Sequence, residues 1–372
     1  MHILIAPDSF KESLSAQKVA EAIQEGFSQA IPHASFDLLP VGDGGEGTMT
    51  ILSQALEMKE YTASVTGPLG QTITVKYARK ANLALFESAD VVGLAMIPKE
   101  KRNPLMIETR GIGELILHLG QEGVKKILIG VGGTASNDGG IGLAAGLGYE
   151  FYDEQGELLE PKGSELGKVA RITRRKIPSF LEEVEIKILT DVINPLCGED
   201  GATFVFAGQK GLSESFFPQV DRTMKHFYQL ANPTIFSLKG AGAGGGIAAG
   251  LVTFVGGKMI SGIDTCMDLL HFEERVQTAD LVIVGEGKLD LQSLAGKAPI
   301  GIARKVPSGI PVIAICGSLS EDLPQFPFEK ILAAFSVISR VESLEDTLSH
   351  AEDNLIQTAR NIGNLFKYKN NH

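Results

Sequence analysis

The sequence predicts an α/β fold with two α/β domains, one of which is a doubly wound parallel-sheet domain of the flavodoxin-like type. Short apolar runs without polar alternation recur along the chain, as in strands buried on both faces. Amphipathic helical stretches separate several of these runs. A length of 372 residues is also about that of two domains.

The predicted strands and helices follow from these runs in order. The strands are expected at residues 3–6, 38–41, 127–131, 186–189, 235–238, 281–284, 312–315 and 332–337. Helices are expected at residues 15–30 with Ser15 as the cap, at 111–120, at 299–306, from Thr48 onward and after Gly246. Most of the expected strands end in a glycine-rich turn that carries a carboxylate or an amide.

One region has a different pattern. Residues 62–65 and 72–75 alternate in polarity and are joined by the turn 67–70, which predicts antiparallel strands. We therefore predict a discontinuous doubly wound domain made of residues 1–60 and 277–372. Residues 61–276 would form a mixed α/β domain inserted into it, with the active site in the cleft between the two.

Composition excludes several classes of protein. A net charge of −11 disfavours nucleic acid or an anionic membrane as a partner. Three widely spaced cysteines, Cys197, Cys266 and Cys316, form neither a disulfide framework nor a zinc motif. The apolar start of the chain is too short for a signal peptide, so we expect a cytoplasmic protein.

Two glycine-rich turns carry pairs of carboxylates. Residues 42–48 place Asp43 and Glu46 among four glycines, so the backbone can fold closely around a ligand; a simple helix-capping turn is the less favoured alternative. Residues 285–293 place Glu286 and Asp290 four apart after a buried strand, a pattern suited to Mg²⁺. An ordinary turn with an exposed acidic pair explains the second motif almost as well.

The remaining motifs are open to two interpretations. Residues 240–246 match G-x-G-x-x-G through Gly240, Gly242 and Gly245, which fits either phosphate binding or close helix packing. Asp191 follows a predicted strand and either accepts a hydroxyl proton, binds metal or forms a plain turn. Residues 136–140 resemble a common turn without chemistry. Walker A and protein-kinase signatures are absent.

Taken in order, these segments resemble the type 1 glycerate kinase family. The matching blocks cover nearly the whole chain: residues 5–15, 42–48, 65–70, 102–104, 132–140, 191–196, 209–211, 240–246 and 285–296. The chain departs from the family pattern at Gly208, where we expect proline, at Lys288, where arginine is usual, and at Ile112, where threonine is common. Lysine in place of arginine could weaken a bidentate contact.

The resemblance implies an enzyme that phosphorylates D-glycerate with ATP and Mg²⁺, with 2-phosphoglycerate favoured over 3-phosphoglycerate as the product. The implied partners are small molecules, and the chain could form a homo-oligomer. We hypothesise catalytic roles for Asp191, Lys11 and Asp43, nucleotide binding by Gly240, Gly242, Gly244, Gly245 and Lys288, substrate binding by Asp8, Ser9, Arg102, Asn194 and Lys210, and metal binding by Glu286 and Asp290.

Two other functions remain open at this point. The 240–246 loop with Asp264 as a ribose ligand would suit a nicotinamide-dependent oxidoreductase. A non-catalytic sugar-acid sensor on the same fold would need no magnesium site.

Overall fold

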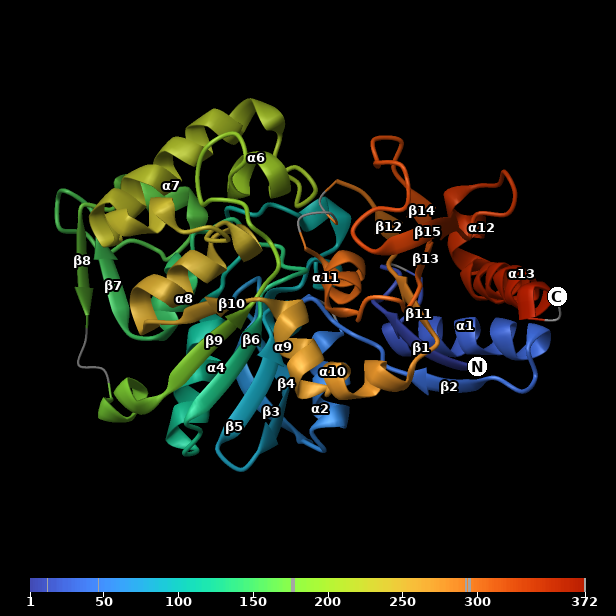
Figure 1. Ribbon diagram of the computed structural model, residues 1–372. Helices are drawn as coiled ribbons and strands as arrows, with labels where there is room; N and C mark the ends of the chain where they lie inside the picture. Colours follow the sequence, from blue (N-terminus) through green and yellow to red (C-terminus); the bar gives the residue numbers. More distant parts are fainter. Residues whose placement is uncertain (12, 46, 175–177, 292, 294–295, 371–372) are drawn as a thin grey trace. The chain divides into compact units, whose positions relative to one another are not determined.

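A computed structural model of the chain describes residues 1–11, 13–45, 47–174, 178–291, 293 and 296–370 (Figure 1). It contains two compact units. The first unit comprises residues Met1–Asp43, Thr50–Ala55 and Gly262 onward, and therefore contains both ends of the chain. The second unit comprises Gly44–Met49 and Leu56–Ser261.

The first unit is built on a five-stranded parallel sheet with the strand order β15-β13-β11-β1-β2. Its strands are β1 (His2–Pro7), β2 (Ser35–Leu38), β11 (Leu281–Gly285), β13 (Val312–Cys316) and β15 (Ile331–Ser336). Renumbered along the chain, this is the 2-1-3-4-5 order of flavodoxin-like sheets, whose direction of winding reverses between β1 and β11. The predicted fold class is confirmed.

The register of the two central strands fixes where their loops begin. Ile3 pairs with Leu281 and Pro7 with Gly285, so Asp8 and Glu286 are the next residues after adjacent strand ends. Every residue of β11 is buried, because helices cover both faces of a doubly wound sheet. Ligands of such sheets bind at the carboxyl ends of the strands where the winding reverses.

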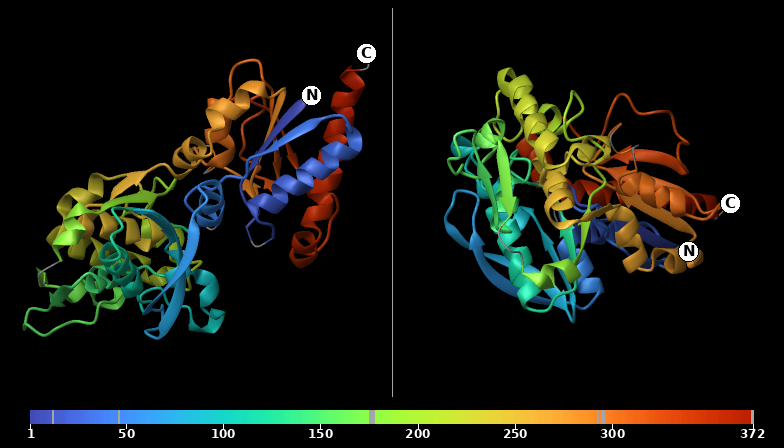
Figure 2. Two further views of the ribbon diagram at one scale, coloured as in Figure 1. Left: turned by 90° about the horizontal axis from the view of Figure 1, so that it is seen from below. Right: turned by 90° about the vertical axis from the view of Figure 1, so that its left-hand side faces the viewer.

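Two long helices of the first unit, α1 (Ala16–Ala30) and α13 (Ala351–Asn370), lie side by side (Figure 1, Figure 2). Ser15 caps α1 as predicted, since its side chain accepts a hydrogen bond from the Lys18 amide. The helices meet at Gly26, where an added Cβ would lie 2.3 Å from the Ile356 carbonyl oxygen. The other helices and strands of this unit are α2 (Thr48–Ala55), which begins in the second unit, α9 (Gly262–Leu269), α10 (Phe272–Arg275), η8 (Val276–Thr278), β12 (Lys288–Leu289), α11 (Ala298–Lys305), β14 (Ser318–Leu319) and α12 (Leu344–Ser349).

The second unit has a six-stranded mixed sheet with the order β10-β9-β6-β5-β4-β3. Its strands are β3 (Lys59–Thr66), β4 (Thr72–Lys80), β5 (Leu83–Glu87), β6 (Lys126–Gly130), β9 (Glu185–Leu189) and β10 (Lys258–Ile260). The four strands from β10 to β5 are parallel, whereas β4 pairs antiparallel with both β5 and β3. The antiparallel hairpin predicted from residues 62–75 is confirmed.

Helices and a small antiparallel ribbon complete the second unit. They are α3 (Ala89–Val92), η1 (Leu94–Met96), η2 (Lys99–Lys101), α4 (Arg110–Gln121), α5 (Ile141–Gly146), β7 (Tyr149–Tyr152), η3 (Gly163–Lys168), β8 (Arg171–Arg174), η4 (Ser179–Glu183), α6 (Ala202–Phe206), η5 (Glu214–Phe216), α7 (Phe217–Ala231), η6 (Pro233–Ser237), η7 (Ala243–Gly245) and α8 (Ile247–Val255). The helices expected at 111–120, at 299–306, from Thr48 and after Gly246 correspond to α4, α11, α2 and α8.

Two predicted strands need correction. Residues 235–238 do not form a strand, because Pro233 opens the short 3₁₀ helix η6 and the Asn232 side chain accepts from the Thr234 amide to cap it. The strand expected at 38–41 is β2 and lies earlier, at Ser35–Leu38. Its residues are partly exposed, as in an edge strand. Beyond Leu38 the chain still bonds to β1, because the Leu39 amide donates to the Ile5 carbonyl at 2.8 Å and the Val41 amide to the Pro7 carbonyl at 3.0 Å, on either side of Pro40.

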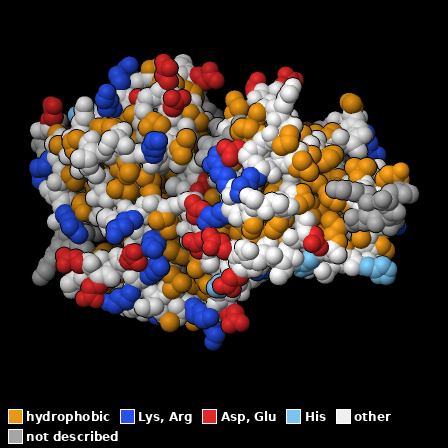
Figure 3. All heavy atoms as spheres, viewed as in Figure 1, with side chains coloured by type: hydrophobic (Ala, Val, Ile, Leu, Met, Phe, Trp, Pro, Cys, Tyr) orange, Lys and Arg blue, Asp and Glu red, His pale blue; other side chains and the backbone are white. Residues whose placement is uncertain are grey.

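On the face drawn in Figure 3, acidic and basic side chains are interspersed. Within the described residues, no helix combines the length and the apolar character that a membrane crossing requires.

The contact at Gly26 gives a test of the first unit's packing. We expect Gly26→Ala to lower the free energy of unfolding by about 1–3 kcal/mol, because the new methyl group would collide with the α13 backbone. Urea denaturation would measure it, with the exposed Lys18→Ala on the same helix as a control that changes stability by no more than about 0.5 kcal/mol. A Gly26→Ala protein as stable as the wild type would contradict this packing.

Candidate active site

Two buried carboxylates lie at the winding reversal of the first unit. Asp8 is 7% exposed and Glu286 is 8% exposed, and the Asp8 amide donates to the Gly285 carbonyl at 2.8 Å. Burial, followed by the charge of Asp43, raises the pKa of Asp8 well above its usual value. Burial also raises the pKa of Glu286 to about 7, and Asp43 contributes to that shift. Asp8, Asp43 and Glu286 therefore repel one another electrostatically.

The loop after β1 lies against the turn after β11. An added Cβ at Gly287 would lie 3.3 Å from the Lys11 amide nitrogen, so the two segments touch through backbone atoms. The Ser9 amide donates to Asp8 Oδ1 at 2.6 Å, and the charge of Lys11 opposes the rise in the pKa of Asp8. The structure thus brings together four of the predicted site residues: Asp8, Lys11, Asp43 and Glu286.

Asp290 is positioned differently from Glu286. Its Oδ1 accepts from the Ser293 amide at 3.2 Å, and its carboxylate lies 4.0 Å from the ammonium of the mostly exposed Lys288. These contacts hold the turn after β12 together. Asp290 does contribute to the raised pKa of Glu286, so the two predicted metal ligands are electrostatic neighbours.

Glu286 has the property expected of a cation ligand. Its Oε1 is buried and has no hydrogen-bond partner among the described residues. A buried carboxylate oxygen without a donor is costly, and a divalent cation would compensate it. No group of three His, Cys, Asp or Glu side chains in the described ranges is arranged to hold a metal by itself. The site therefore suits an ion such as Mg²⁺, which takes one or two carboxylates together with phosphate oxygens.

In the second unit, glycines lie against the carboxyl ends of two parallel strands. An added Cβ at Gly44 would lie 2.5 Å from the Leu189 carbonyl oxygen at the end of β9. An added Cβ at Gly132, just after β6, would lie 2.8 Å from Gly45 Cα. Only glycine permits these approaches, so the predicted functional turn 42–48 is packed onto the strand ends. Glu46, predicted as its second carboxylate, lies outside the described residues.

Glu87, at the end of β5, anchors the same turn. Its carboxylate accepts hydrogen bonds from the Gly47 amide at 3.3 Å and from the Met49 amide at 2.8 Å, at the start of α2. Thr48 Oγ1 accepts from the Gly44 amide at 3.1 Å and closes the turn from within. A carboxylate at a helix N-terminus is favourable, because the exposed amides there carry partial positive charge.

Asp191 and Asn194 follow β9. Asp191 Oδ1 accepts from the Ser261 hydroxyl at 2.9 Å, just beyond β10. The Asn194 side-chain amide donates to the Asp200 carbonyl at 2.8 Å, which closes the loop 194–200. Asp191 is thus held at a strand end of the second unit, as predicted, while the Asn194 amide nitrogen is engaged in shaping its own loop.

Lys210 and Arg102 differ in their surroundings. Lys210 is 4% exposed, and its ammonium donates to the Ser136 carbonyl at 2.7 Å and the Thr134 hydroxyl at 3.4 Å. The Arg102 guanidinium donates to the carbonyls of Ile97 and Leu94, at 3.2 and 3.4 Å, and braces the segment that contains η1 and η2.

The glycines of the 240–246 loop make contacts typical of close packing. An added Cβ at Gly242 would lie 2.4 Å from the Pro195 carbonyl oxygen, and one at Gly245 would lie 2.0 Å from the Ser136 carbonyl oxygen. The amides of Ala241, Gly242, Ala243 and Gly245 donate to backbone carbonyls. Phosphate binding by Gly240, Gly242, Gly244 and Gly245 stays a prediction.

The same loop lacks the context of a dinucleotide fingerprint. That motif requires a strand before the glycines, and the 3₁₀ helix η6 stands there instead. Asp264, the expected ribose ligand, lies on α9 and pairs with Lys305 at 3.0 Å in the first unit. We therefore set the oxidoreductase aside.

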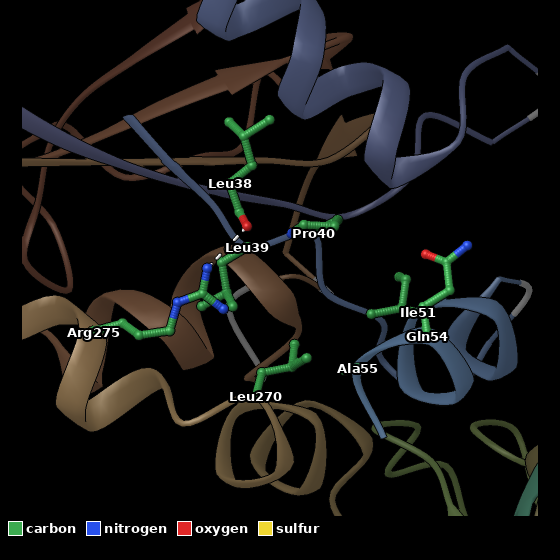
Figure 4. A pocket seen from close by; sticks show the side chains of 8 residues that line it. All are labelled: Leu38, Leu39, Pro40, Ile51, Gln54, Ala55, Leu270 and Arg275. Carbon is green, nitrogen blue, oxygen red and sulfur yellow. Dashed lines mark hydrogen bonds between the residues drawn. The ribbon is translucent and has the colours of Figure 1, made fainter. Parts of the chain in front are cut away.

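A separate cavity of about 150 Å³ lies in the first unit (Figure 4). It is lined mainly by apolar side chains such as Leu39, Ile51 and Leu270, and none of the predicted site residues lines it. The Arg275 guanidinium at its edge is bonded to Asp37 and to the Leu38 carbonyl. The cavity is therefore distinct from the candidate site.

Sequence reasoning missed residues that shape the site. Glu87 was not singled out, although a carboxylate directly after the apolar run 83–86 matches the pattern used elsewhere. Asp138 was set aside as part of a common turn, yet it is fully buried and accepts from the Thr109 hydroxyl at 2.5 Å and the Gly140 amide at 2.9 Å.

A substitution at Glu87 tests whether its hydrogen bonds anchor the 47–49 segment. Glu87→Gln replaces one acceptor oxygen by an amide group that cannot accept from the facing N–H, so we expect a loss of about 1–3 kcal/mol in unfolding free energy. The matched control is Glu60→Gln, on the exposed face of β3, which should cost less than about 1 kcal/mol. Urea titration of both variants measures the difference; equal midpoints would show that Glu87 does not anchor the turn.

A model of the Glycerate kinase family matches residues 3–367. The chain is 57% identical to a glycerate kinase of Neisseria meningitidis serogroup B over 98% of both chains. It is 39% identical to a glycerate 2-kinase of Escherichia coli K12 over 97% of both. The crystal structure of a protein assigned as glycerate kinase 2 from Salmonella typhimurium LT2 superposes with a TM-score of 0.80 at 38% identity, covering all of both chains.

These similarities extend over both units and include the loops that carry Asp8, Asp43, Asp191, Lys210 and Glu286. The chain therefore belongs to the glycerate kinase family.

Proposed function

We propose that the chain transfers a phosphoryl group from ATP to D-glycerate and yields 2-phosphoglycerate. The observation that carries this proposal is the pair of buried carboxylates, Asp8 and Glu286, with the Lys11 charge nearby, at the winding reversal of the first unit. Such a position is where doubly wound sheets bind nucleotides and other phosphorylated ligands. Membership of the glycerate kinase family supports D-glycerate as the phosphoryl acceptor. The name of one relative, glycerate 2-kinase, supports 2-phosphoglycerate as the product.

The first unit would hold the phosphate groups. Lys11, on the loop that follows β1, and Lys288, the first residue of β12, supply positive charge, and the Lys11 amide lies against Gly287 beside Lys288. Asp8, Asp43 and Glu286 are the side chains that would hold Mg²⁺, with Asp290 shaping the turn. A bound Mg²⁺ would neutralise the phosphate oxygens that repel an incoming hydroxyl. The protein's own part is to position the groups, as phosphoryl transfer mainly requires.

Asp191 is the residue we propose for orienting the acceptor hydroxyl. Its hydrogen bond from Ser261 fixes the carboxylate at the end of β9, where ligands of parallel sheets bind. Asp43 is the second candidate for orienting the hydroxyl. It ranks lower because it lies among the carboxylates of the first unit, where it is better suited to hold a cation. The predicted location of the active site in a cleft between the two domains stays a prediction.

The reaction itself is tested with purified protein, D-glycerate, ATP and Mg²⁺. We expect phosphorus NMR to show a new ester on the 2-hydroxyl of glycerate and a stoichiometric amount of ADP. A phosphate on the 3-hydroxyl would refute the proposed position. Binding of D-glycerate without any turnover would favour the sugar-acid sensor.

Asp191→Asn tests the orientation of the hydroxyl. We expect kcat to fall about 10²–10⁴-fold with little change in thermal stability, since asparagine can still accept from Ser261. Asp200→Asn, exposed on the same loop, should leave kcat within about twofold of the wild-type value. Near-normal turnover of Asp191→Asn would remove the residue from the chemistry.

Glu286→Gln tests the cation site by a readout other than activity. Because the folded-state pKa of Glu286 is about 7 rather than 4.5, deprotonation destabilises the fold as the pH rises through that window. Without a cation, Glu286→Gln should therefore melt no lower than the wild type at pH 7.5. With ADP present, Mg²⁺ should raise the melting temperature of the wild type but not of the variant.

The matched control for this test is Glu321→Gln, an exposed carboxylate of the first unit. It should respond to Mg²⁺ like the wild type. An undiminished Mg²⁺ response in Glu286→Gln would exclude Glu286 as a ligand.

A further inference from the structure

Lys210 is a buried cation without an acidic partner at bonding distance. It follows α6 and is 4% exposed, and no carboxylate among the described residues lies within ion-pair distance of its ammonium. Among the described residues, its hydrogen-bond acceptors are the Ser136 carbonyl and the Thr134 hydroxyl, which are both neutral. An ammonium removed from water in this way is costly unless a negative charge compensates it.

The negative charge of Asp138 acts on Lys210, but the carboxylate oxygens of Asp138 accept hydrogen bonds from other groups. Oδ1 accepts from the Gly140 amide at 2.9 Å, and Oδ2 accepts from the Thr109 hydroxyl at 2.5 Å and the Gly142 amide at 3.2 Å. Asp138 opposes the fall in the pKa of Lys210, yet burial prevails and lowers that pKa to about 7. The compensation inside the protein is therefore incomplete.

Two polar groups beside Lys210 lack hydrogen-bond partners. Ser136 Oγ and Asn137 Oδ1 are buried and have no hydrogen-bond partner among the described residues. The other end of the Asn137 amide donates to the Thr203 hydroxyl on α6 at 3.0 Å, which ties this segment to the helix that leads to Lys210. Buried polar groups normally find partners, so two unpartnered groups in adjacent residues, beside a buried ammonium without an acidic partner, indicate a ligand.

We propose that Lys210, Ser136 and Asn137 form a subsite for the carboxylate and the 3-hydroxyl of D-glycerate, the hydroxyl that the proposed transfer leaves unmodified. This inference rests on the proposed function. The Lys210 ammonium and the Ser136 hydroxyl donate to the two carboxylate oxygens, and Asn137 Oδ1 accepts from the hydroxyl. The two groups that lack partners, Ser136 Oγ and Asn137 Oδ1, are then satisfied, and the charge of Lys210 is neutralised by one negative charge.

A carboxylate suits this subsite better than a phosphate group. A single ammonium balances a monoanion, whereas phosphates are usually held by several amides, by arginine or by a cation. The nearby loop 240–246 offers few amides, since those of Ala241, Gly242, Ala243 and Gly245 are already bonded to carbonyls. The subsite also belongs to the loop after β6, whose Gly132 contacts the turn at Gly45, and Gly133 beside Thr134 is exposed to solvent.

The test uses the full chain and measures D-glycerate and ATP–Mg²⁺ affinity by isothermal titration calorimetry. Lys210→Met should weaken D-glycerate binding about 10- to 100-fold, the usual effect of losing a hydrogen bond to a charged group, and leave ATP–Mg²⁺ affinity within about twofold. Lys168→Met, an exposed lysine paired with Glu165, is the matched control and should bind both ligands normally.

Ser136→Ala separates ligand binding from folding. Its hydroxyl bonds no described residue, so alanine should leave the melting temperature unchanged while D-glycerate binding weakens about 3- to 10-fold. A structural role alone would predict no change in affinity. This variant keeps the test decisive if Lys210→Met does not fold.

The outcomes also separate this inference from the proposed function. Wild-type protein that neither binds nor phosphorylates D-glycerate would refute the proposed function. Wild-type binding that both variants retain within twofold would overturn the subsite alone. Loss of ATP–Mg²⁺ affinity with normal D-glycerate binding in Lys210→Met would assign the lysine to phosphate and would equally overturn it.

The affinity should also depend on pH. Burial lowers the pKa of Lys210 to about 7, and among the described residues the charge of Asp138 opposes this shift, so the ammonium is lost as the pH rises above neutrality. D-glycerate affinity of the wild type should therefore fall between pH 6.5 and about 9, while Lys210→Met should show a flat profile over this range. A flat wild-type profile would contradict binding by the charged lysine.

Discussion

The backbone of Gly44 and Gly45 lies directly against the ends of β9 and β6, and this contact sets the geometry of the second unit's candidate site. No residue with a side chain could take the place of Gly44, whose Cβ would fall 2.5 Å from a strand-end carbonyl oxygen. Glu87 and Thr48 then hold the turn by accepting from its amides. Gly44 thus lies against the β9 end that precedes Asp191, and Gly45 against the β6 loop that bonds Lys210, which suits a site that must position small anions.

Charge is distributed unevenly for an acidic protein that is proposed to bind two anions. In the first unit, the charge of Asp43 raises the pKa values of Asp8 and Glu286, and Glu286 also raises that of Asp8; this excess of negative charge requires a cation. In the second unit, Lys210 is a buried positive charge without an acid at bonding distance among the described residues, and it requires an anion. Mg²⁺ bound to phosphates would balance the negative charge of the first unit, and a substrate carboxylate would balance the positive charge of Lys210. The net charge of −11 is therefore no obstacle to a kinase.

The sequence alone predicted the fold class and most strands, because buried parallel strands appear as unbroken apolar runs such as 281–284 and 312–315. It failed at residues 235–238, where Pro233 begins a 3₁₀ helix, and it placed the edge strand β2 too late along the chain. Among site residues, Asp8, Lys11, Asp43 and Glu286, to which the sequence assigned separate roles, lie together in the first unit. Glu87 and Asp138 escaped prediction, since their importance comes from partners distant in sequence, the amides of the 47–49 segment and Thr109. No local pattern encodes such contacts.

We propose that the glycine-lined strand ends of the second unit bind the acid substrate. Hydrogen–deuterium exchange with and without saturating D-glycerate tests it directly, because a bound ligand slows the opening of the backbone that it contacts. We expect slower exchange in peptides covering 44–49, 132–138 and 190–194, with no change in α13. Unchanged exchange in all three segments, at a concentration of D-glycerate that saturates the protein, would contradict it.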